Sequence, residues 1–184
     1  MYFGGEKMIG LNKEEVKLYP HSADWAEEYE KEKVILQKIL GDDIIEIHHV
    51  GSTSIPGLMA KPIIDIAVGV KDEQTQIKLI PILASYGYDM KDSIKEKGEV
   101  LARKGPPELR THYIHIEIIN TPKWEEHILF KDYLIKHPEY VQKYQNLKQK
   151  LAQECNLNRK LYTSQKDEFI KDVLKKAKEE RAKK

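Results

Sequence analysis

The stretch His48–Asp65, HHVGSTSIPGLMAKPIID, decides how this chain folds. It begins at the end of segment 44–50, which is rich in β-branched residues, alternates in polarity and therefore predicts a strand. Gly-Ser and Pro-Gly pairs follow, and they predict a loop. Segment 62–70 is almost continuously apolar, which is typical of a strand buried on both faces. The stretch therefore joins two strands through a loop and places Asp65 inside the second strand.

Further elements are expected on both sides of these two strands. They are a strand over 111–119 and helices over 21–40, over 73–86, from Thr121-Pro122 onward, over 138–151 and over 163–178. Pro81 is expected to kink or split the second helix. Segment 89–101 is ambiguous, and Arg103–Pro107 is expected to be a loop.

This order of elements predicts the α/β (α+β) class. We expect a mixed sheet with flanking helices and a helical C-terminal part. The chain divides into an N-terminal extension over 1–17, a single domain over 18–178 and a polar tail over 179–184.

The composition limits the classes of function. The chain has 184 residues, of which 40% are hydrophobic and 33% charged, so one core and a polar surface are expected. The net charge of +1 creates no overall field that would attract nucleic acid or an anionic membrane, and an anion site must therefore be local. We expect no nucleic-acid partner.

Other features favour a cytoplasmic location. No apolar run approaches the ~20 residues of a membrane span, and we expect no membrane contact. Residues 1–7 lack the pattern of a signal peptide. Cys155 is the single cysteine, cannot form an internal disulfide, and is expected to be a packed thiol.

The chemistry of the loop suits phosphate binding. Gly51 allows the backbone to approach a phosphate closely, and the hydroxyl of Ser52 and the backbone amides can donate to its oxygens. A carboxylate on the next strand, Asp65, can hold Mg²⁺ beside those oxygens. Lys61 and Arg110 are candidate ligands of the phosphate charge, with a solvated charge or an ion pair as the alternative for each.

The period of two along a strand predicts which side chains share a face. In the third strand, Ile114 and Ile116 belong to the core face together with His112, which is expected to be structural. His115 and Glu117 point the other way. If the polar faces of the strands coincide, one cluster forms from Asp65, Glu117, His115, His48 and Glu46.

Here the chain resembles a known family. Gly51-Ser52 followed by Asp65-Ile66-Ala67 is similar to the pattern of the polymerase-β-like nucleotidyltransferase superfamily. More narrowly, Gly-Ser-Thr-Ser-Ile-Pro-Gly-Leu with Ala-Lys-Pro-Ile-Ile-Asp-Ile resembles the signature of the GrpB family, of the UPF0157 type. Segments 110–115, 124–138 and 162–170 extend the resemblance, which therefore runs from about residue 18 to 174.

The resemblance implies a nucleotidyltransferase-like fold and the metal-dependent transfer of a nucleotidyl group to an acceptor. The partner it implies is a nucleotide or another phosphorylated small molecule, with a link to coenzyme A metabolism, because some relatives are fused to dephospho-coenzyme A kinase. The residues it implies are Asp65, Glu117 and His115 for catalysis, Asp65 and Glu117 for Mg²⁺, and Gly51, Ser52, Thr53, Lys61 and Arg110 for the phosphates.

One departure from the superfamily leaves enzymatic activity open. Ala67 occupies the place of the second acidic residue, and a two-metal site needs several carboxylates. The alternative is a non-catalytic module that binds a nucleotide or coenzyme A on a degenerate fold. A third alternative is an interaction protein that uses its C-terminal helices.

Several side chains also have a structural alternative. Asp65 could form a buried ion pair with Lys61, Gly51 could only shape a turn, and His115 could be a satisfied structural histidine. The residues at helical spacing that are expected to be core are Trp124, His127, Phe130 and Tyr133.

Overall fold

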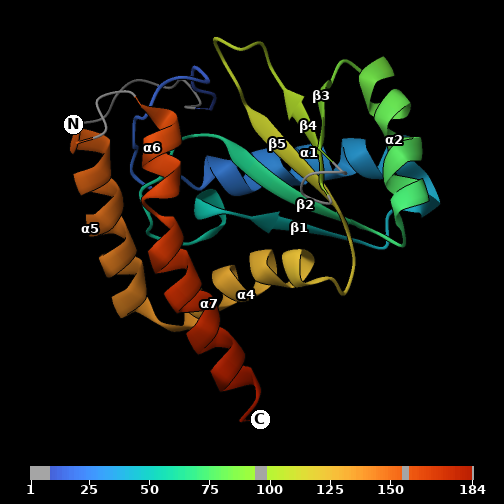
Figure 1. Ribbon diagram of the computed structural model, residues 1–184. Coiled ribbons are helices and arrows are strands. Elements are labelled where there is room, and N and C mark those ends of the chain that lie inside the picture. The colour runs from blue at the N-terminus through green and yellow to red at the C-terminus, as the bar shows by residue number, and fades with distance from the viewer. Residues whose placement is uncertain (1–8, 94–98, 155–157, 184) are drawn as a thin grey trace.

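A mixed five-stranded sheet lies at the centre of the computed structural model, which describes residues 9–93, 99–154 and 158–183 (Figure 1). The strand order is β1-β2-β5-β4-β3, in which β2 and β5 are parallel and the other neighbours are antiparallel. The strands are β1 (Glu46–Val50), β2 (Ile64–Val70), β3 (Asp89–Ser93), β4 (Glu99–Lys104) and β5 (His112–Ile118).

Some of the helices begin where a side chain satisfies a free backbone amide. Asp72 accepts a hydrogen bond from the amide of Thr75 at 2.8 Å, and Thr121 precedes a proline at the first helical turn. The helical elements are α1 (Asp24–Leu40), η1 (Gly41–Asp43), η2 (Ser52–Ser54), α2 (Glu73–Ser85), α4 (Pro122–Lys136), α5 (Pro138–Glu154), α6 (Arg159–Ser164) and α7 (Asp167–Arg181).

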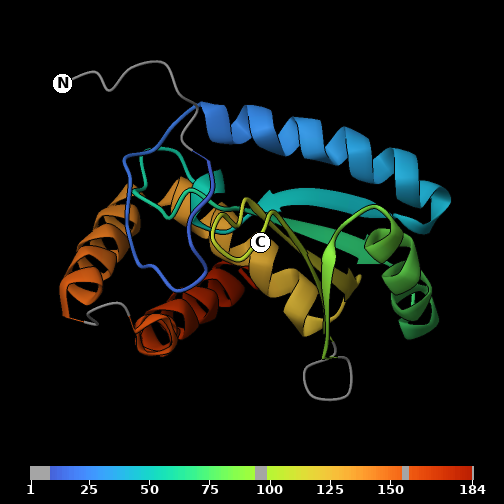
Figure 2. The same ribbon diagram turned by 90° about the horizontal axis from the view of Figure 1, so that it is seen from above.

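Helices α1 and α2 cover one face of the sheet. Trp25 and Leu36 of α1 pack with Leu83 of α2 against the apolar side chains of the strands. Figure 2 shows α1 on one side of the sheet and α4 on the other. The buried strand residues on this first face include Ile64, Ile66, Val68, Val100, Ala102, Ile114 and Ile116.

The second face lies against α4 and the C-terminal helices. Trp124 of α4 packs with Val50 and Ala67, and α4 is joined to α5 and α7 by a second apolar cluster. Gly69 allows this close approach, because a Cβ atom there would lie 2.8 Å from the Trp124 ring. The class is therefore mixed α/β with a helical C-terminal part, as predicted.

Three local expectations differ from the structure. Pro81 lies inside a single helix, α2, and does not split it. Arg103 and Lys104 were expected to begin a loop, but they are the last two residues of β4, which pairs with β5. The expected last helix over 163–178 is two helices, α6 and α7, and α7 continues to Arg181.

Cys155, expected to be a packed thiol, lies outside the described residues. Among the described helices, none combines the length and the apolar character that crossing a membrane requires.

Candidate functional site

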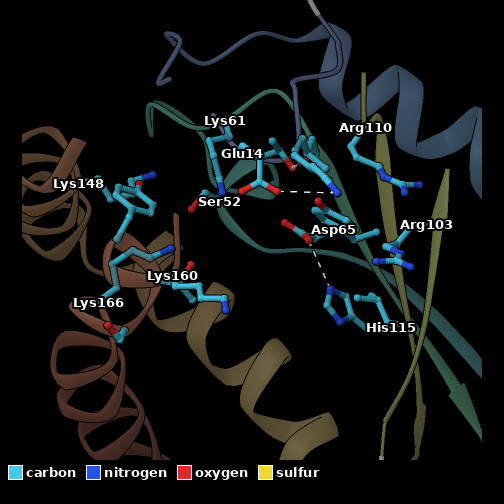
Figure 3. A pocket seen from close by; sticks show the side chains of 18 of the residues that line it. Glu14, Ser52, Lys61, Asp65, Arg103, Arg110, His115, Lys148, Lys160 and Lys166 are labelled. Carbon is cyan, nitrogen blue, oxygen red and sulfur yellow. Dashed lines mark hydrogen bonds and ion pairs between the residues drawn. The ribbon is translucent and has the colours of Figure 1, made fainter. Parts of the chain in front are cut away.

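A cavity of about 910 Å³ is lined by the sheet and by the C-terminal helices. Lys148 and Lys166 reach it from the helical side and Arg103 from the opposite side, with Asp65 between them (Figure 3). Its charged lining consists of seven basic and three acidic side chains: Lys13, Lys61, Arg103, Arg110, Lys148, Lys160, Lys166, Glu14, Asp65 and Asp167. Basic side chains therefore outnumber acidic ones around this cavity.

Gly51 is in close contact with Asp65, which lines the cavity. The β1–β2 register places Val50 opposite Asp65, so the chain turns directly over this carboxylate. Gly51 has φ +67°, and a Cβ atom there would lie 2.6 Å from Asp65 Oδ2. Any larger residue would be strained and would collide with the carboxylate.

His115 holds the other oxygen of Asp65. His115 Nε2 lies 3.4 Å from Asp65 Oδ1, and both side chains are partly exposed to the cavity. Burial by itself raises the pKa of Asp65, but the hydrogen bond and charge of His115, together with Lys61 and His127, outweigh it and hold that pKa below its usual value. Asp65 is therefore an anion near neutral pH.

The hydroxyls of the loop are tied to neighbouring elements. Ser52 is hydrogen-bonded to the side chain of Tyr144 on α5. Thr53 is buried, and its hydroxyl lies 3.0 Å from His49 Nε2 and 3.5 Å from the carbonyl oxygen of Ile63. Thr53 lines the cavity but is held by these contacts, so it shapes the loop rather than offering a free donor.

Three lysines gather on the helical side of the cavity. Lys61 Nζ lies 5.5 Å and Lys166 Nζ 4.5 Å from the centre of the Tyr162 ring. Lys148 is only 2% exposed, donates to the carbonyl oxygen of Met59 and lies 4.9 Å from the Tyr144 ring centre.

Lys148 is in an unfavourable position for a charge. Burial, with the neighbouring charges of Lys166 and Lys61, lowers its pKa to about 6. No carboxylate of the described residues forms an ion pair with it. An anion in the cavity would supply the missing counter-charge.

On the opposite side of the cavity, Asp89 forms ion pairs with two arginines. Arg110 is buried, donates to Asp89 Oδ2 and donates to the carbonyl oxygen of Gly105 at 2.7 Å. Arg103 lies 3.0 Å from the other oxygen of Asp89. The ion-pair alternative for Arg110 is therefore present in the structure, although its side chain also lines the cavity.

The polar side chains predicted to form one cluster share a face but do not all line the cavity. The register places Glu46 level with Gly69 and His48 level with Ala67, on the face that carries Asp65. Glu46 and His48 form an exposed pair at 2.8 Å, away from the lining of the cavity.

Glu117 also lies outside the cavity lining. It is level with Gly69, four residues along β2 from Asp65, and its Oε1 is 3.1 Å from Nε2 of His127 on α4. Four residues of strand correspond to roughly 13 Å. The backbone positions of Asp65 and Glu117 are thus well separated along the sheet, with His115 between them, and the joint metal site expected from the resemblance stays a prediction.

Two important residues were missed from the sequence. His127 was expected to be core, but it is partly exposed and pairs with Glu117. Lys148 was not singled out, although it lies at helical spacing between Tyr144 and Leu151 on the buried side of α5. A lysine in the apolar stripe of an amphipathic helix was the signal that could have revealed it.

Comparisons with known proteins agree with the fold and the motifs. The GrpB protein family model matches residues 15–176. The chain is 37% identical to "Glutamate-rich protein GrpB" of Alkalihalophilus pseudofirmus over 91% of this chain and 98% of that protein. The crystal structure of conserved protein GrpB from Enterococcus faecalis has 34% identity and a TM-score of 0.82, covering 90% of this chain and 99% of that one.

Two other likenesses are more distant. The Cid1 poly(U) polymerase has 12% identity and a TM-score of 0.41 over 67% of this chain and 44% of that chain. A dephospho-CoA kinase of Mycolicibacterium paratuberculosis is 24% identical over 88% of this chain, which spans 46% of that protein. The match over nearly the whole chain, together with the close structural likeness, assigns this chain to the GrpB protein family.

Proposed function

We propose that the cavity binds a nucleotide or a coenzyme A-like molecule through its phosphate groups, and that the protein transfers the nucleotidyl group of a nucleoside triphosphate to an acceptor. The observation that carries this proposal is Lys148, a buried lysine that faces a cavity with seven basic and three acidic side chains. Burying a charge without a partner is costly, and a bound phosphate removes that cost. The cytoplasmic location expected from the sequence accompanies the proposal as a prediction.

Basic side chains on two opposite sides of the cavity would contact the phosphates. Lys61, Lys148 and Lys166 face the phosphates from one side, and Arg103 from the other. Gly51 lets the backbone pass close to the Asp65 carboxylate, which a side chain at this position would displace. Such fixed charges favour a polyphosphate and hold it in one orientation.

Mg²⁺, which the family resemblance implies, fits this lining as a single ion. One carboxylate with phosphate oxygens and water is a common ligand set for Mg²⁺, and Asp65 supplies the carboxylate. A second Mg²⁺ does not fit within this lining, because Ala67 is fully buried against Trp124 and Glu117 lies outside the lining. When bound, Mg²⁺ neutralises charge on the phosphates.

The transfer step requires little of the protein beyond position and charge. The acceptor oxygen forms a bond to the α-phosphorus while the bond from that phosphorus to the leaving pyrophosphate breaks, and the acceptor proton passes to solvent. The basic walls stabilise the charge on the leaving pyrophosphate. His115 is a positioning residue in this scheme, since its hydrogen bond orients Asp65.

Non-catalytic binding is the second candidate. The buried Ala67 favours it, because the superfamily pattern has a carboxylate at that place. In this case the same cavity recognises the phosphates of a nucleotide or of coenzyme A without turnover. The dependence of binding on Asp65 and on Mg²⁺ separates the two candidates.

The test is calorimetric titration of ATP, GTP, CTP, UTP and coenzyme A, each with and without Mg²⁺. The proteins compared are the wild type, Asp65→Asn, Lys148→Met and the control Lys150→Met, whose lysine is exposed on the same helix and 3.8 Å from Glu154. Lys148→Met is expected to weaken binding roughly tenfold to hundredfold, because a hydrogen bond to a charged group contributes about 1.5–3 kcal/mol. Lys150→Met should bind as the wild type does.

Each outcome supports a different conclusion. Binding that requires Mg²⁺ and Asp65, with pyrophosphate release when an acceptor is found, supports transfer. Binding that depends on Lys148 but ignores Mg²⁺ and Asp65 supports the non-catalytic module. If no phosphorylated ligand binds, or if Lys148→Met binds as tightly as the wild type, the cavity is not the site.

A further inference from the structure

Three metal-binding side chains meet between β5 and α4, beside the cavity. His115 and Glu117 are two residues apart on β5 and therefore share a face, and His127 comes from the helix that covers that face. One ligand atom from each of the three lies within 4.8 Å of the other two. The cluster brings together two imidazoles and one carboxylate.

Glu117 is the unusual member of this cluster. Its side chain is 1% exposed, and Oε1 lies 3.1 Å from His127 Nε2 and 3.8 Å from Lys123 Nζ. The other oxygen, Oε2, is buried and has no hydrogen-bond partner among the described residues. A buried acceptor without a partner is costly, and more so when it is charged. An ion pair with His127 alone leaves this oxygen unsatisfied, whereas a cation bound to the carboxylate satisfies it.

We propose that His115, Glu117 and His127 bind one divalent transition-metal ion. Imidazole nitrogens favour ions such as zinc and cobalt, whereas Mg²⁺ favours carboxylate, carbonyl and water oxygens. The ion proposed here therefore differs in kind from the Mg²⁺ proposed at Asp65. Three protein ligands also leave a coordination position for water or another ligand.

The surroundings suit such an ion. The side chains of His115 and His127 are 17% and 26% exposed, which gives an ion a route from solvent. Asp65 contacts His115 Nε2 at 3.4 Å and so restrains the ring. A carboxylate that holds a ligating histidine in this way is a common feature of metal sites, because it fixes the ring and raises its basicity.

The separations of the ligand atoms are compatible with one ion. Two atoms bound to the same ion at about 2.0–2.2 Å lie at most about 4.4 Å apart, and the three ligand atoms here all lie within 4.8 Å of one another. Both histidines are partly exposed at their side chains, so small ring rotations can adjust the geometry. The ion also displaces the ammonium of Lys123 from Glu117, which sets a limit on affinity.

The test is a titration of the chelator-treated protein with cobalt(II), followed by its visible absorption and by competition with zinc(II) and Mg²⁺. The variants are Glu117→Gln, His127→Gln and the control His48→Gln, which removes a histidine whose pair with Glu46 lies on the same sheet face. Each ligand variant is expected to weaken cobalt binding at least about tenfold, the loss typical even for partners of metal ligands. His48→Gln should bind as the wild type does.

The expected result for the wild type is one equivalent of cobalt(II) that zinc(II) displaces and Mg²⁺ does not. A matching rise in melting temperature with zinc(II), absent from His127→Gln, would show that the ion binds the folded protein. The proposal is overturned if the wild type binds no cobalt or zinc, or if both ligand variants bind as tightly as the wild type. These titrations contain no nucleotide, so a negative result leaves the proposed phosphate site untouched.

Discussion

The two faces of the sheet place the same residue type in opposite surroundings. On the face covered by α1, His49 stacks on Tyr29 with ring centres 4.8 Å apart, and burial lowers its pKa to about 4. Burial likewise lowers the pKa of His112 on the same face. On the face covered by α4, His115 and His127 each pair with a carboxylate.

This difference indicates that one face of the sheet contributes mainly to stability and that the other is available for ligand binding. Histidines on the first face are buried, and burial favours their neutral form, so they offer little to a ligand. Histidines on the second face keep partial exposure and lie beside Asp65 or Glu117. We therefore expect substitutions on the first face to change the free energy of unfolding, and substitutions on the second face to change binding.

The largest expected effect is a difference in the free energy of unfolding between substitutions at two neighbouring residues of β5 that point to opposite faces. Ile114→Ala is expected to lower the free energy of unfolding by about 2–5 kcal/mol, because it leaves a cavity in the main core. His115→Gln should change it by less than about 1 kcal/mol, because the ring is partly exposed. Urea unfolding of both variants measures the difference. Equal losses would contradict the separation of the two faces.

The central strands and their faces could be predicted because periodicity is a local property of sequence. The alternation along 112–118 correctly placed His112 with the core and His115 with Asp65 on the other face. The helix starts at Thr121 and Pro138 were also correct, because capping and proline geometry depend on neighbouring residues.

The grouping of the site could not be predicted from the same pattern. Faces alone do not say how far apart two residues lie along the strands, and the register separates Glu117 from Asp65. The position of α4 then decides that Glu117 meets His127. The role of Lys148 depends on the packing of α5 against the loop at Met59, a contact between residues 89 positions apart.

The second effect concerns pH and the buried His49. The pKa in the folded protein is about 4, below the usual 6.5, so the unfolded chain binds more protons between these values. The stabilising contribution is therefore complete above pH 6.5 and is lost as the pH falls toward 4. Its size is on the order of 3 kcal/mol, since one pKa unit corresponds to about 1.4 kcal/mol.

The comparison with His49→Gln isolates this contribution from that of the carboxylates. Guanidinium unfolding of both proteins at pH 6.5 and at pH 4.5 should show a smaller loss of stability in the variant. If the two proteins lose equal stability over this range, His49 is not held neutral by its packing, and the contrast between the two faces is weaker than the structure indicates.

The smallest expected effect is the pH dependence of ATP binding that Lys148 causes. Lys148 has a pKa of about 6 because of burial and the charges of Lys166 and Lys61, so much of it is neutral at pH 7.5. A bound phosphate favours the ammonium form, and binding should therefore take up a proton. The affinity for ATP should accordingly fall as the pH rises above 6, by at most about tenfold per pH unit from this group.

Calorimetry in buffers of different ionisation enthalpy measures that proton uptake directly. ATP has its own ionisation near neutral pH, so the informative quantity is the difference between the wild type and Lys148→Met titrated under identical conditions. The wild type should take up more protons per ATP bound at pH 7.5, up to one, and the difference should shrink as the pH is lowered to 5.5. Equal uptake at both pH values would mean that the ligand does not reach Lys148, and that the buried lysine only anchors α5 to the carbonyl oxygen of Met59.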